Sequence, residues 1–110
     1  MSVLKLIGLI DKVDEYIGHH SFRDLKVLAY LYQSEHSVVC FQSIIRDLEL
    51  SAVGVTRSLK VLIDREMITL SMDTEDTRKK SVSLTDKGNA LKLHIIEILG
   101  DTHGSKSKSQ

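Results

Sequence analysis

Two groups of basic residues in this 110-residue chain have the side-chain chemistry to contact a polyanion. Arg57 and Lys60 lie three residues apart in a segment with helical periodicity. Arg78, Lys79 and Lys80 form a run between two alternating segments. A guanidinium can form paired hydrogen bonds to guanine O6 and N7 or to a phosphate, whereas a lysine ammonium acts on phosphate as a point charge. These two groups are therefore the first candidates for a binding site.

The segment 51–66, which contains the first group, is predicted to be an amphipathic helix. Its apolar residues recur at steps of three and four, which places them on one face: Ala52, Val55, Leu59, Leu62 and Ile63. At roughly 100° per residue, the opposite face carries Val53, Arg57, Lys60 and Asp64. Ser51 is placed to accept a hydrogen bond from the first-turn N–H groups and so begin the helix. A helix with a small, basic outer face near its start can enter the major groove of DNA.

Several further side chains of this helix are candidate DNA contacts. Val53 could meet a thymine methyl group, and Thr56 could bond to a base or a phosphate. Gly54 would let the helix backbone approach DNA closely. The full predicted set in this helix is Ser51, Val53, Gly54, Thr56, Arg57 and Lys60. The alternative interpretation of the same face is an ordinary solvated surface.

The segment after the helix is predicted to be a β-hairpin with one face in water. Residues 68–72 alternate between apolar and polar types, and the alternation resumes after a charged stretch. The residues expected to point inward are Ile68, Leu70, Met72, Val82 and Leu84. Period-two alternation of this kind is typical of strands that pack on a core by one face. A helix followed by a hairpin with a charged tip, here 73–81, is the outline of a winged helix-turn-helix.

The basic residues at this tip predict contacts outside the major groove. Arg78 should reach the minor groove, where the negative potential is strongest if the groove is narrow. Lys79 and Lys80 are candidates for phosphate contacts and would add to the salt dependence of binding. The alternative is a flexible charged loop with no ligand.

The tip and the residues after it resemble a known family. Asp76-x-Arg78, followed after five residues by Leu84-Thr85 and then by Asp86-Lys-Gly88, resembles the wing and next helix start of MarR-type transcriptional regulators. The resemblance implies that Asp76 holds the wing arginine or the loop and does not touch DNA. It also implies a repressor-like regulator that competes with polymerase or another factor for its site.

The helix before the hairpin carries the second part of the resemblance. Val55-Thr56-Arg57, with Leu62, Met67 and Ile68 downstream, is similar to the recognition helix of this family and its exit. The close match covers about 55–88, and a looser one extends back to about residue 22. The chain departs from the family at Glu66, where a glycine usually ends the helix, and at Thr77, where a second wing arginine is common.

The N-terminal half is predicted to supply a buried helix and the first part of the binding core. Residues 3–18 are apolar on more sides than one packing face needs, which predicts burial within the chain or against a partner. Ser21 and Asp24 have the spacing of a capping box for a second helix. Residues 38–41 are expected to add a strand to the hairpin. Gln42 and Ser43 open the next short helix and could donate to a phosphate, although simple capping explains them equally well.

The remaining reactive residue types do not form a chemical site in the sequence. Cys40 lies in an apolar run, so we expect it to be buried and unreactive. The five histidines lack metal-ligand spacing, and no nucleophile–base pair or glycine-rich phosphate loop is present. We therefore expect neither a metal nor another cofactor, and no enzymatic activity.

Length and charge limit the domain organisation and the location. A chain of 110 residues with zero formal net charge is one domain by size, and bulk electrostatics does not mark it as a nucleic-acid binder. We predict a single domain over 1–100, with dimerisation helices at about 3–18 and 86–99 around a DNA-binding core at about 21–85. The Ser/Lys-rich tail 101–110 is expected to be disordered. The charged N-terminal run is neither a signal peptide nor a spanning helix, which favours the cytoplasm.

The combined prediction is a mainly α chain with a small antiparallel β wing: a winged helix-turn-helix with flanking dimerisation helices. It would act as a homodimer on a near-palindromic site in double-stranded DNA, without a membrane partner. The sequence is compatible with a small-molecule effector but does not indicate one. Two alternatives stay open: a winged helix used for protein–protein contact, and a plasmid or phage replication or partition factor.

Overall fold

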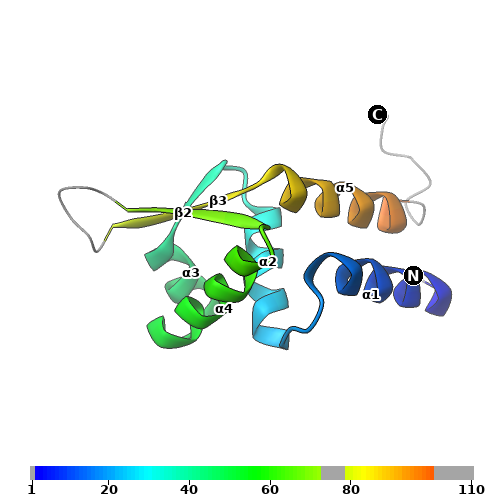
Figure 1. Cartoon of the computed structure of the whole chain (residues 1–110), viewed down its shortest axis with the longest axis horizontal. Coiled ribbons are helices and arrows are strands. Elements are labelled where there is room, and N and C mark those ends of the chain that lie inside the picture. Colours follow the sequence, from blue (N-terminus) through cyan, green and yellow to red (C-terminus); the bar gives the residue numbers. More distant parts are fainter. Residues whose placement is uncertain (1, 73–78, 101–110) are drawn as a thin grey trace.

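A computed structural model describes residues 2–72 and 79–100 of the chain. Asp76, Arg78 and the tail 101–110 lie outside these residues. In chain order the elements are α1 (Val3–Ile17), α2 (Phe22–Gln33), β1 (Val38–Cys40), α3 (Phe41–Leu48), α4 (Ala52–Asp64), β2 (Ile68–Met72), β3 (Lys80–Leu84) and α5 (Asp86–Gly100). Figure 1 shows the β2–β3 hairpin projecting from one end of the molecule and α1 and α5 extending at the other. The predicted mainly α arrangement with a small β wing is therefore confirmed.

Side-chain hydrogen bonds confirm the helix starts predicted at Ser21 and Ser51, and another bond caps the last helix. The Ser21 hydroxyl accepts from the Asp24 amide (3.2 Å), and the Asp24 carboxylate accepts from the Ser21 amide (2.9 Å), which completes the capping box of α2. Ser51 accepts from the Gly54 amide at the start of α4 (2.9 Å), and Thr85 accepts from the Gly88 amide in the first turn of α5 (3.0 Å). Each cap satisfies an N–H group that the helix itself leaves unpaired.

The three strands form an antiparallel sheet in the order β1-β3-β2. Val82, in the central strand, lies opposite Val39 of β1 and Leu70 of β2. Burial of the inward hairpin residues is confirmed for Ile68 and Val82 but not for Leu70 and Met72, which are 38% and 51% exposed. The alternation was correct, but the hairpin extends past the helices, so its outer part has no core beneath it.

The core lies where α2, α3 and α4 meet the near end of the sheet. α2 packs against α4, and α1 packs against α5. The buried apolar residues are Val13, Ile17, Val27, Leu28, Leu31, Val39, Phe41, Ile44, Val55, Leu59, Leu62, Met67, Ile68, Val82 and Leu91. Most of the first half of α1 contributes nothing to this core and is exposed.

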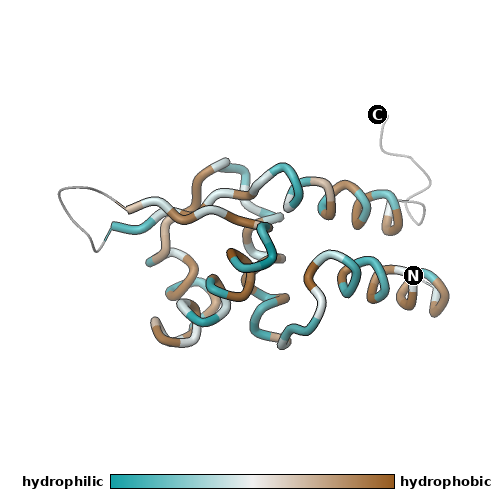
Figure 2. Tube along the Cα trace, viewed as in Figure 1, coloured by the Kyte–Doolittle hydropathy of each residue, from teal (hydrophilic) through white to brown (hydrophobic). Residues whose placement is uncertain are grey.

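The molecule is extended because elements project at both ends. Its principal extents are 47 × 33 × 26 Å, and its radius of gyration is 15.0 Å. A compact domain of about 100 residues would have a radius of gyration of about 13 Å. Figure 2 shows apolar turns along α1 and α5, the two helices that extend away from the core. Such exposed apolar turns suit contact with another protein surface.

The exit of α4 is tied directly to the entry of α5. Glu66 adopts a left-handed conformation (φ 62°), the conformation that the family's usual glycine would favour at this position. The Thr85 hydroxyl donates to the Glu66 carbonyl (2.6 Å), and the Thr85 amide donates to the Met67 carbonyl (3.0 Å). Lys87 donates to the Arg65 carbonyl (2.8 Å). These bonds fix the end of α4, the hairpin base and α5 relative to one another.

We predict that Gly88→Ala disrupts this junction. A Cβ at Gly88 would overlap the Met67 carbonyl oxygen, so the backbone would have to move. The free energy of unfolding should fall by about 1–3 kcal/mol, the usual cost of overpacking. Urea denaturation measures the change. Gly8→Ala is the matched control because nothing lies within 4 Å of its Cβ, and it should not destabilise the chain. Equal stability of the two variants would contradict this account of the junction.

We also predict an alkaline loss of stability that depends on Tyr32. Its hydroxyl donates to the Gly88 carbonyl (2.7 Å), and burial, followed by the nearby Tyr16, raises the pKa of Tyr32 well above its ordinary 10.0. A raised folded-state pKa gives a contribution that is complete below the unfolded pKa and is lost as the pH rises above it. Thermal melts at about pH 8 and about pH 11 should show a larger drop for the wild type than for Tyr32→Phe. Equal drops would show that Tyr32 ionisation is not coupled to folding.

Candidate nucleic-acid interface

Helix α4 presents its predicted polar face to solvent. Val53, Thr56, Arg57 and Lys60 are all exposed, while Val55, Leu59 and Leu62 are buried as predicted. Within the described residues, neither Arg57 nor Lys60 forms a hydrogen bond or an ion pair. The expected burial of Ala52 and Ile63 was wrong: both are exposed. At about 100° per residue, both lie at the edge of the apolar stripe next to Thr56, where Ile63 lines an open hollow and is not part of the core. The exposed face is consequently wider than the sequence pattern indicated.

Gly54 lies on the buried side of α4, not on its exposed face. Its amide is already bonded to Ser51, and a Cβ there would lie 3.1 Å from the Ser51 hydroxyl and 3.4 Å from Arg23 Cδ. The prediction that Gly54 lets the backbone approach DNA was therefore wrong: the approaching group is the arginine stem from α2. Ser51 caps the helix and is exposed at its start, as predicted.

Sequence reasoning missed the polar pair beneath this face. Ser58 is fully buried, and its hydroxyl accepts a hydrogen bond from Nε of Arg23 (2.8 Å). The two residues are 35 positions apart, so no local spacing could have paired them. The only available signal was a serine on the apolar side of an amphipathic helix, where a buried hydroxyl requires a partner.

Of the two lysines in the described part of the wing, one packs against a core residue and the other is exposed. Lys79 is exposed, whereas Lys80 is half-buried with its ammonium 4.8 Å from the centre of the Phe41 ring. This cation–π contact holds the Lys80 side chain against the start of α3. Arg78 and Asp76, the residues predicted for minor-groove contact and wing stabilisation, lie outside the described residues.

A shallow hollow of about 280 Å³ separates α4 from the wing. Its sides carry Lys60 on the helix and Lys80 on the strand, and its floor is mainly apolar. The residues lining it are Phe41, Thr56, Leu59, Lys60, Ile63, Asp64, Leu70 and Lys80. Asp64 brings one negative charge to the same hollow. The arrangement could accommodate a phosphate backbone held between two cations.

The two predicted phosphate donors at the start of α3 differ in exposure. Gln42 is exposed and Ser43 is half-buried, so Gln42 is the more accessible of the two. Cys40 is the N-cap residue of α3 and makes no side-chain cap. The expectation that Cys40 is buried was wrong: the alternation of β1 buries Val39 and exposes its neighbours.

The end of α3 carries an exposed polar cluster that sequence reasoning missed. Tyr30 donates to one carboxylate oxygen of Asp47 (2.5 Å), and Arg46 donates to the other (2.9 Å). The hydrogen bond from Tyr30, followed by that from Arg46, lowers the pKa of Asp47. The same bond to Asp47 raises the pKa of Tyr30. Arg46 is thus already paired within the chain, unlike Arg57.

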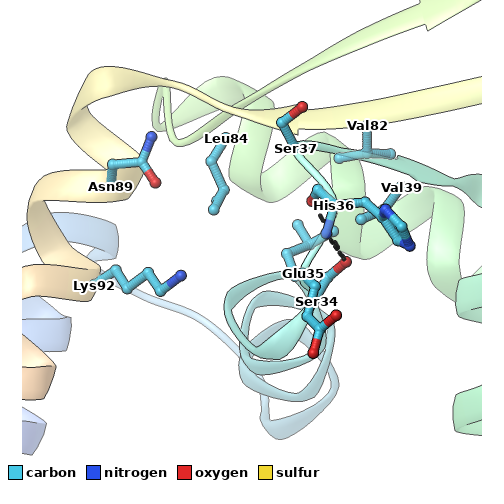
Figure 3. Close-up of a pocket in the computed structure, with 10 residues that line it drawn as sticks. Ser34, Glu35, His36, Ser37, Val39, Val82, Leu84, Asn89 and Lys92 are labelled. Atoms are coloured by element: carbon cyan, nitrogen blue, oxygen red, sulfur yellow. Dashed lines mark hydrogen bonds between the residues drawn. The ribbon is translucent and has the colours of Figure 1, made fainter.

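A separate cavity of about 250 Å³ lies between the α2–β1 loop, β3 and α5 (Figure 3). Leu31, Val39, Val82 and Leu84 supply apolar lining, while Lys92 and Asn89 point toward it from α5. It could accommodate a small molecule with both polar and apolar parts. None of the predicted DNA-binding residues lines it.

A metal site and a membrane span are both absent from the described residues. Among residues 2–72 and 79–100, no group of three or more His, Cys, Asp or Glu side chains could hold a metal ion. No helix in that part of the chain is long and apolar enough to cross a membrane.

Comparison with known proteins shows similarity at the level of structure. No family model and no curated protein matches the sequence. The S. aureus MepR–DNA complex is 21% identical with a TM-score of 0.71, covering 94% of this chain and 82% of that chain. A cysteine-to-serine mutant of E. coli MarR with operator DNA is 17% identical with a TM-score of 0.63, covering 94% and 74%. Bordetella bronchiseptica BpsR, described with regulation of its DNA binding by 6-hydroxynicotinic acid, is 17% identical with a TM-score of 0.63, covering 97% and 81%.

This likeness establishes the fold. The five helices and the three-stranded antiparallel sheet of residues 2–72 and 79–100 match the winged helix-turn-helix arrangement of those structures. All three proteins are described by DNA complexes or DNA binding, and none by a catalysed reaction. The fold class predicted from the sequence is therefore confirmed.

Proposed function

We propose that this chain is a homodimeric regulator of the MarR type that binds a specific site in double-stranded DNA and represses transcription by occupying it. The observation that carries the proposal is the exposed face of α4, where Arg57 and Lys60 have no partner among the described residues. Such a face on a capped helix beside a wing can enter a major groove and read base edges. The similar folds solved with DNA support it.

Each predicted side chain then has a separate role. Arg57 and Thr56 would contact base edges, with Val53 against a thymine methyl group. Lys60, Gln42, Ser43 and Ser51 would contact phosphates, together with Lys79 and Lys80 of the wing, and Arg78 would enter the minor groove. Gly54 is removed from this set because it faces α2. A role on DNA is consistent with the predicted cytoplasmic location and with the predicted lack of enzymatic activity.

Dimerisation is supported by the apolar surface of the terminal helices. Leu4 of α1 is 79% exposed and Leu93 of α5 is 65% exposed. The other exposed apolar residues of these helices are Val3, Leu6, Ile7, Ile10 and Ile96. A surface of this kind, on two helices that pack against each other, suits a two-fold interface with a second copy. The single domain over 1–100 would then comprise these helices and the binding core, with recognition helices about 34 Å apart.

We predict that Arg57→Ala weakens DNA binding without unfolding the chain. The exposed arginine forms no hydrogen bond or ion pair within the described residues, so its loss should not destabilise the fold, and losing its base contact should cost about 1–3 kcal/mol of binding free energy. Fluorescence anisotropy with a labelled mixed-sequence duplex at low and moderate salt measures the effect. Lys92→Ala, which removes a charge from α5, is the control and should bind nearly as well as the wild type.

Two results would reject this function. One is absence of duplex binding at low salt by the folded wild type, which would favour the protein–protein alternative. The other is equal affinity of the Arg57→Ala and Lys92→Ala variants. A replication or partition factor would also bind the duplex and depend on Arg57. The positions of its selected binding sites relative to promoters would distinguish it from a repressor.

We predict that Leu93→Glu converts the dimer to a monomer. A carboxylate placed in the centre of an apolar interface would be buried without a partner, which is strongly unfavourable. Sedimentation equilibrium should give the mass of one chain for the variant and of two for the wild type. Thr69→Glu, on the exposed face of β2, should remain dimeric. A wild type that is monomeric at micromolar concentration would contradict the proposed assembly.

A further inference from the structure

Arg23 is held in a fixed position against the recognition helix. Its Nε donates to the hydroxyl of Ser58 (2.8 Å), and Ser58 is fully buried in α4. A Cβ at Gly54 would lie 3.4 Å from Cδ and 3.8 Å from Nη1 of Arg23, so the missing side chain leaves room for the arginine stem. The side chain therefore crosses from the start of α2 to the first turns of α4.

The guanidinium of Arg23 has unused hydrogen-bonding capacity. An arginine has five N–H donors, and only Nε is engaged in the described structure. Arg23 forms no ion pair with any residue in 2–72 or 79–100. The adjacent Asp24 forms no ion pair with it: Oδ2 of that buried carboxylate accepts from the Ser21 amide, and Oδ1 has no hydrogen-bond partner in the described structure. A half-buried guanidinium whose Nη donors are unpaired in the described structure can bind an anion from outside the chain.

Arg23 and the wing lie on opposite edges of the exposed face of α4. Thr56 lines the hollow shared with the wing, whereas Gly54 faces Arg23. Gly54 and Thr56 are two positions apart in the chain, so they are separated by about 200° around the helix axis. Arg57 and Lys60 therefore project between a cation from α2 on one side and the wing lysines on the other. A helix in a major groove has one phosphate backbone along each edge, because the groove is about 12 Å wide.

We propose that Arg23 is a DNA phosphate contact, anchored by Ser58, on the backbone opposite the one that the wing follows. The inference rests on the proposed DNA-binding function and extends the interface to α2. Anchoring at Nε leaves the Nη groups to form the paired bonds that suit a phosphate. Because the side chain is ordered before binding, less conformational entropy is lost when the contact forms.

The first test is the salt dependence of Arg23→Gln binding to a labelled mixed-sequence duplex. Each neutralised phosphate contributes about 0.9 to the slope of log affinity against log salt. Over a tenfold change in salt concentration, one such contact changes the affinity by about eightfold. The slope should therefore fall by about 0.9 for Arg23→Gln. Lys92→Gln loses the same charge from α5 and should keep the wild-type slope. A slope for Arg23→Gln equal to that of Lys92→Gln would overturn the assignment.

Two more variants separate phosphate contact from a purely structural role. Ser58→Ala keeps the guanidinium but removes its anchor, so the slope should be unchanged and the affinity about two- to tenfold weaker. If Arg23→Gln does not fold, Arg23→Lys provides the test. Arg23→Lys keeps the positive charge and should keep the salt slope, but a lysine cannot bond to Ser58 and to a phosphate at the same time, so its affinity for the duplex should be lower. An affinity equal to that of the wild type would reject the proposal.

A modified duplex identifies the phosphate directly. Neutral methylphosphonates are placed one at a time along a selected site. At one position, the replacement should lower the affinity of the wild type for the duplex and leave the affinity of Arg23→Gln unchanged. A scan with no such position overturns the Arg23 assignment. If the wild type binds DNA and depends on Arg57, such a failure concerns Arg23 alone, whereas loss of the Arg57 dependence removes the proposed function itself.

Discussion

The exit of α4 lies close to the entry of α5, and this contact fixes how the helix and the wing are placed relative to α5. The Met67 carbonyl lies against Gly88 and accepts the Thr85 amide, while Thr85 also bonds to Glu66 and caps α5. This junction connects α4, the base of the wing and the helix proposed for dimerisation. A change in the direction of α5 should therefore move α4, the proposed recognition helix, as well. In the proposed dimer, the junction would set the spacing of the two recognition helices.

Electrostatics at the proposed interface is local, because the chain has no net charge. Two acidic side chains are hydrogen-bonded within the chain, Asp24 to the Ser21 amide and Asp47 to Tyr30 and Arg46, while Asp64 lines the hollow beside Lys60. Arg57, Lys60 and Arg23 form no ion pair among the described residues and lie on and around α4. Charges on other parts of the surface are screened over about 10 Å at 0.1 M salt, so the proposed contact with DNA depends on these local charges. Binding should depend more on this geometry than on general attraction to a polyanion.

The sequence predicted the elements well because their signals are local. Capping residues at Ser21 and Ser51 marked two helix starts, and alternation marked the hairpin. What it could not predict depended on tertiary distances. Leu70 has the correct alternation, but whether a core lies beneath it depends on how far the hairpin extends. Gly54 has the sequence context of a DNA-facing residue, and only the packing of α2 on α4 shows that it accommodates Arg23.

Hydroxyl-radical footprinting on a duplex selected from a random pool shows whether a dimer reads two half-sites with two copies of α4. We expect two equivalent patches of protection, related by a two-fold axis and centred about 10–10.5 base pairs, or a multiple of that distance, apart on one face of the duplex. A single patch, or a pool from which no palindromic site emerges, would contradict this expectation.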